Sequence, residues 1–267
     1  MAKAAAPARH RARKRFGQHF LHDPAVIARI VRAIAPRAGD ALVEIGPGLG
    51  ALTAPLLEAA GALTVIELDR DVIPHLRAAC RDNPALRVIE ADALRVDYSA
   101  LAAQLAPGSR LRLAGNLPYN ISTPLLFHLL EHAGAIADMH FMLQKEVVRR
   151  LCAAPDTADY GRLTVTLAAR AEAAGLFTVG PGAFNPPPRV DSAVVRITPR
   201  PAPFPLRDLA RYDRLVTLAF GQRRKTLHNA LRGEVSPGAF ATAGVDARAR
   251  GETLSPEAFA RLANAAG

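Results

Sequence analysis

Short apolar runs alternate with helical patterns through the first two thirds of the chain. Runs with the length and composition of β-strands occur at 41–45, 62–66, 86–90, 110–114 and 139–143. The stretches between them have the apolar spacing of helices. Strands that alternate with helices predict a mostly parallel sheet with helices on both faces. The pattern therefore predicts an α/β fold.

Two helices have clear beginnings. Asp23 is a favourable N-cap residue, and Pro24 suits the first helical position. The apolar residues that follow at helical spacing are Val26, Ile27, Ile30, Val31 and Ile34. A second helix is expected from Ser122, and its inward-facing residues are Leu125, Leu126, Leu129 and Leu130. Both helices are therefore expected to pack through one apolar face.

The last third of the chain has a different pattern. Strand-like runs at 172–179 and 192–198 have no obvious helix between them, which predicts an antiparallel pair at the sheet edge. The segment 199–206 carries four prolines and indicates a stiff linker. Beyond it the pattern is helical, and one face is made by Leu209, Tyr212, Leu215, Val216 and Ala219. We therefore place a domain boundary near residue 200.

Composition narrows the class of protein. The 267 residues are 50% hydrophobic and 22% charged, which excludes a disordered chain. Lys and Arg total 34 against 24 acids, and the net charge of +10 favours a nucleic-acid partner. Cys80 and Cys152 are too few for a disulfide framework or a zinc cage, and we expect reduced thiols in the core. No apolar run reaches the ~18 residues that a membrane span needs.

The start of the chain is strongly basic. The first 22 residues hold six basic residues and no acid. No apolar stretch follows that would make them a secretory signal. The segment therefore suits either a solvated, disordered tail or a basic arm that contacts a polyanion.

A glycine-rich turn follows the first strand. Gly46, Gly48 and Gly50 are spaced G-x-G-x-G, which differs from the dinucleotide-binding G-x-G-x-x-G and lacks the Lys of a P-loop. On its own this pattern also suits an ordinary tight turn. Glu67 ends the second strand and Asp92 follows the third, at the edge where ligands bind in open α/β sheets. Together these features favour a nucleoside ligand without phosphate, such as S-adenosylmethionine.

The fourth strand runs into the most specific motif of the chain, Asn116-Leu117-Pro118-Tyr119. The amino group of adenine is a poor nucleophile because its lone pair is delocalised into the ring. The Asn116 side-chain oxygen and the Leu117 carbonyl can accept its two N–H groups and free that lone pair to attack a methyl sulfonium. Pro118 fixes the turn, and Tyr119 offers a ring on which a flipped base can stack. Taken alone, the same residues also suit a β-turn.

Conspicuous motifs follow one another along nearly the whole chain. They are KRFGQHFLHD, VEIGPGLGALT, VIELDRD, EADAL, GNLPYNIS, MLQKEVVRRL, GAFNPPPRVDSAVVRI and FGQRRKTLHNAL. In these motifs the sequence resembles the ribosomal RNA adenine N6-dimethyltransferases of the small-subunit (KsgA/RsmA) type. The resemblance implies a class I, Rossmann-like methyltransferase domain that uses S-adenosylmethionine, with a small helical C-terminal domain. The expected division is a basic flexible tail at 1–15, the methyltransferase domain at 16–199 and the helical domain at 200–267.

The resemblance also implies an activity. Such an enzyme transfers methyl groups from S-adenosylmethionine to N6 of two adjacent adenosines near the 3′ end of small-subunit (16S) rRNA during ribosome biogenesis. The expected partners are the small ribosomal subunit and its rRNA. We expect a monomer in the cytoplasm, with no metal and no membrane contact.

Three alternatives compete with this activity. The nearest is a large-subunit rRNA adenine methyltransferase of the antibiotic-resistance type, against which FGQRRKTL and the long helical C-terminal region argue. The complete set of cofactor motifs disfavours a non-catalytic RNA-binding or assembly factor. The glycine spacing disfavours an NAD-binding enzyme.

The resemblance assigns cofactor roles to single residues. The residues expected at the cofactor are His19, Leu21, Gly46, Gly48, Glu67, Asp92 and Asn116. His19 and Leu21 would close over it, Glu67 would hold the ribose, and Asp92 would hold the adenine amine. Gly46 would lie under the methionine part, and Asn116 would lie next to the methyl group. Many relatives have Asn where this chain has His19, which leaves the side-chain contact there open.

The resemblance also assigns residues to the target RNA. The expected catalytic residues are Asn116, Leu117, Pro118, Tyr119 and Phe184. Phe184 matches a ring on the other face of the target adenine, opposite Tyr119, although it also suits a core position. The cluster Arg223, Arg224 and Lys225 is expected to contact RNA, although such a run also suits a solvated face.

Overall fold

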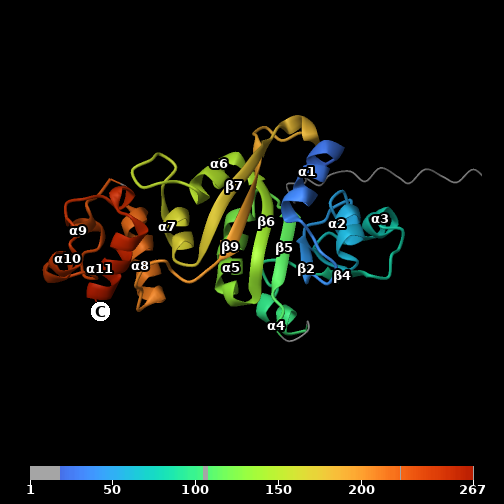
Figure 1. Ribbon diagram of the computed structural model, residues 1–267. Helices are drawn as coiled ribbons and strands as arrows, with labels where there is room; N and C mark the ends of the chain where they lie inside the picture. The colour runs from blue at the N-terminus through green and yellow to red at the C-terminus, as the bar shows by residue number, and fades with distance from the viewer. Residues whose placement is uncertain (1–18, 105–107, 223, 267) are drawn as a thin grey trace, which may run out of the picture.

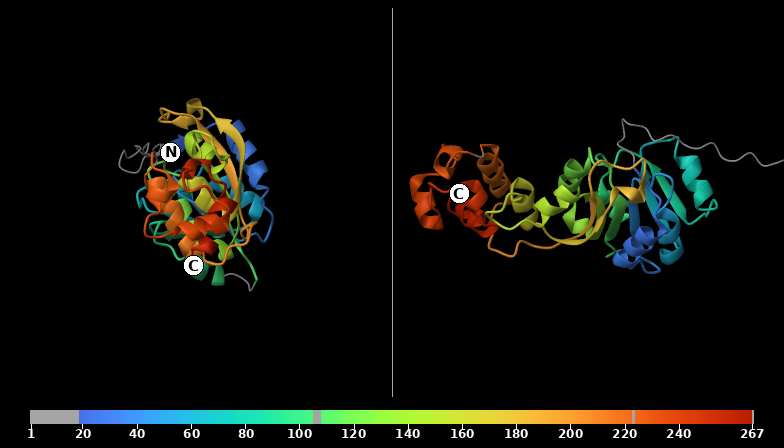
Figure 2. Two further views of the ribbon diagram at one scale, coloured as in Figure 1. Left: turned by 90° about the vertical axis from the view of Figure 1, so that its left-hand side faces the viewer. Right: turned by 90° about the horizontal axis from the view of Figure 1, so that it is seen from above.

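The computed structural model describes residues 19–104, 108–222 and 224–266. The molecule is elongated, with a helical lobe at one end and a sheet covered by helices beyond it (Figures 1 and 2). The predicted tail at 1–15 lies outside the described residues.

A seven-stranded sheet forms the centre, with the strand order β4-β3-β2-β5-β6-β9-β7. Its strands are β2 (Leu42–Ile45), β3 (Leu63–Glu67), β4 (Leu86–Glu90), β5 (Leu111–Asn116), β6 (Ile136–Gln144), β7 (Ala171–Val179) and β9 (Ser192–Pro199). The first five in the spatial order pair in parallel, while β9 pairs antiparallel with both β6 and β7. The predicted parallel sheet and antiparallel edge pair are therefore confirmed.

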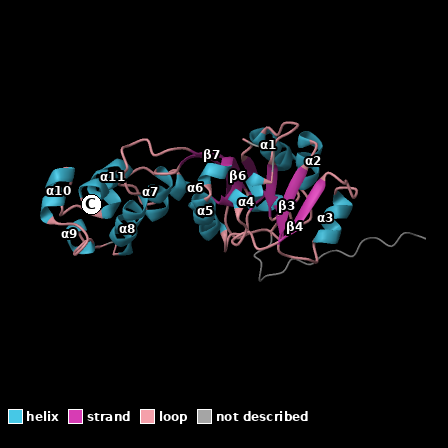
Figure 3. Cartoon of the chain, turned by 90° about the horizontal axis from the view of Figure 1, so that it is seen from below, coloured by secondary structure: helices cyan, strands magenta, loops and turns pink. Residues whose placement is uncertain are grey.

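Helices cover both faces of this sheet (Figure 3). Those of the first part are α1 (Pro24–Ile34), α2 (Thr53–Ala60), α3 (Ile73–Ala79), α4 (Tyr98–Ala103), α5 (Ser122–Glu131), α6 (Lys145–Leu151) and α7 (Arg162–Ala168). The Asp23 side chain accepts from the N–H groups of Ala25 and Val26 at 2.8 and 3.1 Å, so the predicted cap of α1 is confirmed. One apolar cluster joins α1 and α2 to the sheet, and a second joins α4 and α5 to its other face.

A third apolar cluster holds the C-terminal helices together. They are α8 (Leu209–Gly221), α9 (Leu227–Ala230), α10 (Pro237–Ala243) and α11 (Pro256–Ala265), and short 3₁₀ turns lie at η2 (Ala133–Ala135), η3 (Pro181–Ala183) and η4 (Gly251–Thr253). Val165 of α7 belongs to this cluster, and the Tyr212 hydroxyl donates to its carbonyl oxygen at 2.8 Å. The C-terminal core therefore includes residues that come well before the domain boundary predicted near residue 200. The position of that domain boundary stays a prediction.

Two predictions about single residues are wrong. Leu209 is 41% exposed because it is the first residue of α8, and the buried face of that helix begins at Tyr212. Cys152 is exposed at the end of α6, while Cys80 is buried; both are free thiols.

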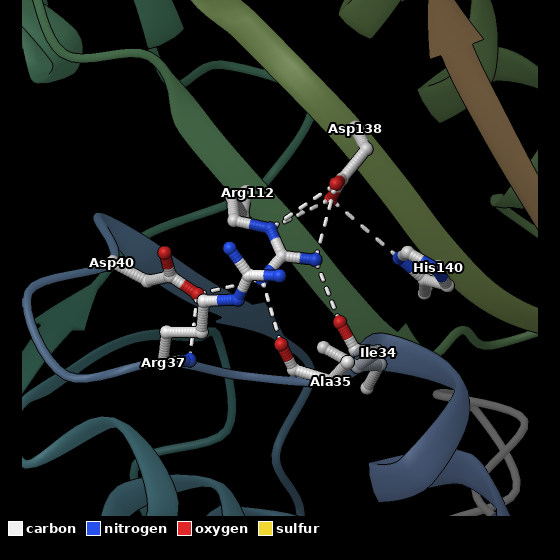
Figure 4. A network of polar contacts seen from close by, with 7 residues as sticks. All are labelled: Ile34, Ala35, Arg37, Asp40, Arg112, Asp138 and His140. Carbon is white, nitrogen blue, oxygen red and sulfur yellow. Dashed lines mark hydrogen bonds and ion pairs between the residues drawn. The ribbon is translucent and has the colours of Figure 1, made fainter.

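A polar network lies where the parallel strands begin. Arg112 on β5 donates to the carbonyl oxygens of Ile34 and Ala35 and pairs with Asp40 and Asp138 at 2.6 and 3.1 Å (Figure 4). The network ties the end of α1 to the loop before β2, to β5 and to β6. This end of the sheet is opposite to the end that carries the predicted ligand-binding residues.

Candidate active site

The strands of the sheet open onto a cavity of about 890 Å³ at their carboxyl ends. It lies where the strand order reverses, since the chain runs outward from β2 through β3 to β4 and then returns to the other side of β2 with β5. Ligands bind at such points in open α/β sheets. The predicted residues that line the cavity are His19, Leu21, Gly46, Gly48, Glu67, Asp92, Asn116, Leu117, Pro118 and Tyr119. Phe184 does not line it.

The glycine turn forms the floor next to β2. Gly46 and Gly48 have φ angles of +67° and +54°, which side chains other than glycine adopt only with strain. The Gly46 N–H donates to the Ile66 carbonyl oxygen at 2.9 Å, and the Gly48 N–H donates to Glu67 Oε2 at 3.2 Å. The turn is thereby fixed to the end of β3, and it brings backbone and carboxylate to the same wall.

The two predicted acids are held by backbone N–H groups. Glu67 Oε1 accepts from the Asp69 N–H at 2.8 Å, and Asp92 Oδ1 accepts from the Leu94 N–H at 3.0 Å. Burial raises the pKa of Glu67, and these backbone hydrogen bonds oppose the rise. Each carboxylate oxygen has two lone pairs, so both acids retain acceptor capacity toward a ligand in the cavity.

Sequence reasoning missed Glu44, which lines the same cavity. It is 1% exposed, and its Oε2 has no hydrogen-bond partner among the described residues. Burial raises its pKa to about 8, and the nearby charge of Glu67 adds to the rise, while Thr53 lowers it. A buried acid with a free oxygen beside a glycine turn is suited to a cationic group of a ligand. The signal was an acid within the otherwise apolar run of the first strand.

Residues 19–22, here called the strap, line one part of the cavity. Within it β1 (Phe20–Leu21) pairs antiparallel with β8 (Phe184–Asn185). His19 Nδ1 lies 2.8 Å from the Pro186 carbonyl oxygen, and a Cβ on Gly48 would lie 3.1 Å from the Phe20 ring. The strap is thereby held against both the glycine turn and the segment after β8.

The amide of Asn116 is oriented by the strap. Its Nδ2 donates to the His19 carbonyl oxygen at 2.9 Å. A carbonyl oxygen only accepts hydrogen bonds, so the nitrogen must face the strap, and Oδ1 is left for a different donor. The neighbouring Leu117 N–H donates to the Met142 carbonyl oxygen at 3.2 Å. A Cβ on Gly115 would lie 2.4 Å from the Ile45 carbonyl oxygen, so glycine is needed where β5 approaches β2.

The Tyr119 ring is held at its hydroxyl end. Its oxygen lies 2.6 Å from the hydroxyl of the fully buried Ser192, and its ring centroid lies 5.6 Å from that of His19. Phe184 is 3% exposed and packs in the apolar cluster that contains α1 and α2. The structure therefore places His19, and not Phe184, beside Tyr119. The role of Phe184 at the target base stays a prediction.

The predicted RNA-contacting cluster lies in the helical lobe. Arg224 and Lys225 are exposed after α8, and Arg223 lies outside the described residues. Figure 1 shows this lobe at the far end of the molecule from α2 and α3. Across the described ranges, no helix is long and apolar enough to cross a membrane, and no group of three or more His, Cys, Asp or Glu side chains could hold a metal ion.

The fold and the cavity place the chain among the Rossmann-like methyltransferases. A dimethyladenosine transferase from Plasmodium falciparum has a similar structure, with a TM-score of 0.74 and 26% sequence identity. The match covers 91% of this chain and 96% of that protein. The 23S rRNA methyltransferase ErmE is also similar, with a TM-score of 0.69 and 29% sequence identity. That match covers 92% of this chain and 98% of ErmE. The predicted fold class is confirmed.

The sequence comparisons are more specific. The family model described as ribosomal RNA adenine dimethylase matches residues 9–266, so the chain belongs to that family. A relative from Pseudomonas putida is 53% identical over 96% of this chain and 95% of its own length. A second, from Xanthomonas axonopodis pv. citri, is 57% identical over 95% of each chain. Both are named ribosomal RNA small subunit methyltransferase A, which confirms the resemblance predicted from the motifs.

Proposed function

We propose that this protein transfers methyl groups from S-adenosylmethionine to N6 of two adjacent adenosines near the 3′ end of small-subunit (16S) rRNA. The family and the names of the relatives at 53% and 57% identity support this activity. The observation that carries it is the Asn116 amide, which the strap turns so that Oδ1 can accept from an amino group. The lower identity of 29% to a 23S rRNA methyltransferase favours the small subunit over the large.

The cavity has the features that this cofactor needs. Its volume of about 890 Å³ is in the range of small-molecule sites. Glu67 would accept from the ribose hydroxyls, and Asp92 from the adenine amine. The free oxygen of Glu44, close to Gly46, suits the ammonium group of the methionine part. The strap residues His19 and Leu21 would cover the bound molecule and exclude water.

The chemistry of this chain is one of positioning. When bound, S-adenosylmethionine supplies an electrophilic methyl group. Asn116 Oδ1 and the Leu117 carbonyl accept the two N–H groups of the adenine amine and favour a pyramidal nitrogen, whose lone pair is then free to form the N–C bond. The bond between the methyl carbon and the sulfonium sulfur would break as this bond forms, and the sulfur would keep the electron pair and leave as a neutral thioether. The nitrogen afterwards releases one proton to solvent, so no strong base is required. A second transfer needs room for one methyl group at the same position.

The target base would leave the RNA stack and lie against Tyr119. The hydroxyl of Tyr119 is already held by Ser192, so the ring is fixed before the base arrives. Phe184 would cover the other face of the base. Since Phe184 is buried and pairs with Leu21, this arrangement requires the strap and β8 to move apart when RNA binds.

The remaining expectations belong to the same proposal. The small subunit is the partner, Arg224 and Lys225 contact its rRNA, and the protein acts as a monomer in the cytoplasm, where subunits are assembled. The domain division at 200 is part of the proposal as well.

The test is transfer of radiolabelled methyl groups to small subunits from a strain that lacks this modification, beside large subunits and free rRNA. We expect label in two adjacent adenosines of the small-subunit rRNA. Label only in the large subunit would assign the chain to the antibiotic-resistance type instead. No label in any substrate, with normal RNA binding, would favour a non-catalytic assembly factor.

A further inference from the structure

A second groove lies outside the candidate active site, between α1 and the outer strands of the sheet. It has a volume of about 420 Å³. Its lining residues are Arg29, Arg32 and Ala33 of α1, Leu176 and Phe177 of β7, and Arg196 of β9. Figure 1 shows the ribbons of α1 and of the two outer strands that contribute these residues. None of them lines the cavity at the carboxyl ends of the strands.

The groove is lined by positively charged side chains and by no acidic side chain. Three of its lining residues are arginines and none is acidic. Within the described ranges, Arg29, Arg32 and Arg196 form no salt bridge, whereas Arg170 and Arg200 near the same sheet edge pair with Asp213 and Glu172. Three like charges around one groove repel each other, so this arrangement favours an anion between them.

The neighbouring strand does not supply the missing acid. Arg196 lies directly opposite His140 in the β6–β9 pair, so the two side chains project from the same face of the sheet. The next residue on that face of β6 is Asp138, and Arg112 already pairs with it (Figure 4). The three groove arginines therefore retain their capacity for an external ligand.

One of the three guanidinium groups is positioned in advance. Arg29 Cζ lies 3.9 Å from the centroid of the Phe177 ring. A cation–π contact of this kind holds the guanidinium through its face and leaves its in-plane N–H groups free. Those N–H groups have the fork geometry that binds two oxygens of one phosphate.

The groove is joined to the strap by α1. The strap ends at His22, and α1 is capped by the next residue, Asp23. At 1.5 Å per residue, Arg29 and Arg32 lie roughly 9 and 14 Å along the helix from that cap. A polyanion that reaches the mouth of the cavity can therefore continue into the groove.

We propose that Arg29, Arg32 and Arg196 bind the phosphate backbone of the rRNA next to the target adenosines. This inference rests on the proposed function, because it takes the RNA to be the substrate. The fork geometry of the arginines, the phenyl ring beneath one of them and the net charge of +10 favour RNA over an acidic protein segment. The contact supplies affinity and orientation, and the base itself is recognised at Asn116 and Tyr119.

The test compares the triple variant Arg29→Gln/Arg32→Gln/Arg196→Gln with the wild type. Binding to protein-free small-subunit rRNA and to unmodified small subunits is measured across a series of KCl concentrations. Loss of three phosphate contacts should weaken RNA binding roughly tenfold or more and reduce the slope of log K against log salt by about 2. The melting temperature and the affinity for S-adenosylmethionine should stay at the wild-type values.

A matched control removes the same charge elsewhere. The variant Arg77→Gln/Arg87→Gln/Arg110→Gln changes exposed arginines on α3, on β4 and before β5. It should bind RNA nearly as the wild type does. An equal loss in both triple variants would show that net charge alone acts, and the groove proposal would be wrong.

Two further outcomes would also overturn the proposal. In the first, the groove variant binds protein-free rRNA as tightly as the wild type does but binds whole subunits more weakly. That result would mean that the groove contacts a ribosomal protein. Unchanged binding in both assays would leave the groove without a role in RNA contact. Failure of wild-type protein to methylate small subunits would remove the proposed function, but the salt dependence of RNA binding would still decide whether the groove binds RNA.

Discussion

Asn116 has two tasks at the residue scale, since its nitrogen holds the strap and its oxygen is presented to the cavity. The variant Asn116→Asp separates them, because a carboxylate can still accept from an amine but cannot donate to the His19 carbonyl. We expect it to weaken cofactor binding roughly 5- to 150-fold, the equivalent of about 1–3 kcal/mol for a polar group left unpaired, and to slow transfer. Isothermal titration and single-turnover transfer measure the two effects.

Asn120→Asp is the control for this substitution. Asn120 lines the same cavity, so the change adds the same charge there. Among the described residues, Asn120 makes no hydrogen bond to the strap, so its variant should keep a cofactor affinity close to wild type. Equal weakening in both variants would mean that charge, and not the strap contact, controls affinity.

Glu44 makes stability depend on pH. Its pKa is raised by burial from an ordinary 4.5 to about 8 in the folded protein. A raised carboxyl pKa means that the folded state holds the proton more tightly, so stability falls as the pH rises from about 4.5 to about 8. In Glu44→Gln this loss is absent. The free energy of urea unfolding of the variant, relative to that of the wild type, should therefore rise by up to ~1.4 kcal/mol per pH unit across that window. Parallel curves for the two proteins would show that Glu44 ionises freely.

At the scale of elements, the strap and the glycine turn act as one unit. Gly48→Ala places a methyl group 3.1 Å from the Phe20 ring, at a φ of +54°. Gly39→Ala is the matched control, because Gly39 has a φ of +87° and nothing within 4 Å of the added group. Both variants should lose about 1 kcal/mol of stability through backbone strain. Only Gly48→Ala should weaken cofactor binding, and equal affinities in a titration would show that the strap contact is dispensable.

Local patterns predicted the elements well, because caps and apolar periodicity are properties of neighbouring residues. The Asp23 cap depends on contacts within a few positions, and the strands at 86–90 and 172–179 are marked by the apolar pattern of neighbouring residues. The pairing of β1 with β8 joins residues more than 160 positions apart and has only two residues in each strand. No periodicity marks so short a pair, and the burial of Phe184 follows from it.

The candidate site was predictable to a similar extent. The strand ends at Glu67, Asp92 and Asn116 converge because parallel strands finish at one edge, which the alternating pattern implies. The orientation of the Asn116 amide and the burial of Glu44 depend on packing between distant segments. The groove of Arg29, Phe177 and Arg196 was missed for the same reason, since its residues come from α1, β7 and β9.

At the scale of the whole molecule, the amino ends of the strands carry a stabilising polar network and the carboxyl ends carry the cavity. Substitutions of Arg112 test whether these two ends are independent. Arg112 binds Asp40, Asp138 and the end of α1 at the amino ends of the strands, far from the cavity (Figure 4). Arg112→Met keeps the apolar stem but leaves two partly buried carboxylates without their cation. The free energy of unfolding should fall by ~2–4 kcal/mol, somewhat less than for a fully buried pair.

Arg112→Lys restores the charge without the planar fork, so its loss should be intermediate. In both variants the affinity for S-adenosylmethionine should change less than twofold while the protein remains folded, because the glycine turn, Glu67 and Asn116 are held by their own contacts at the other end of the sheet. A large loss of affinity at full folding would show that the two ends are coupled through β5, which carries Arg112 near its start and Asn116 at its end.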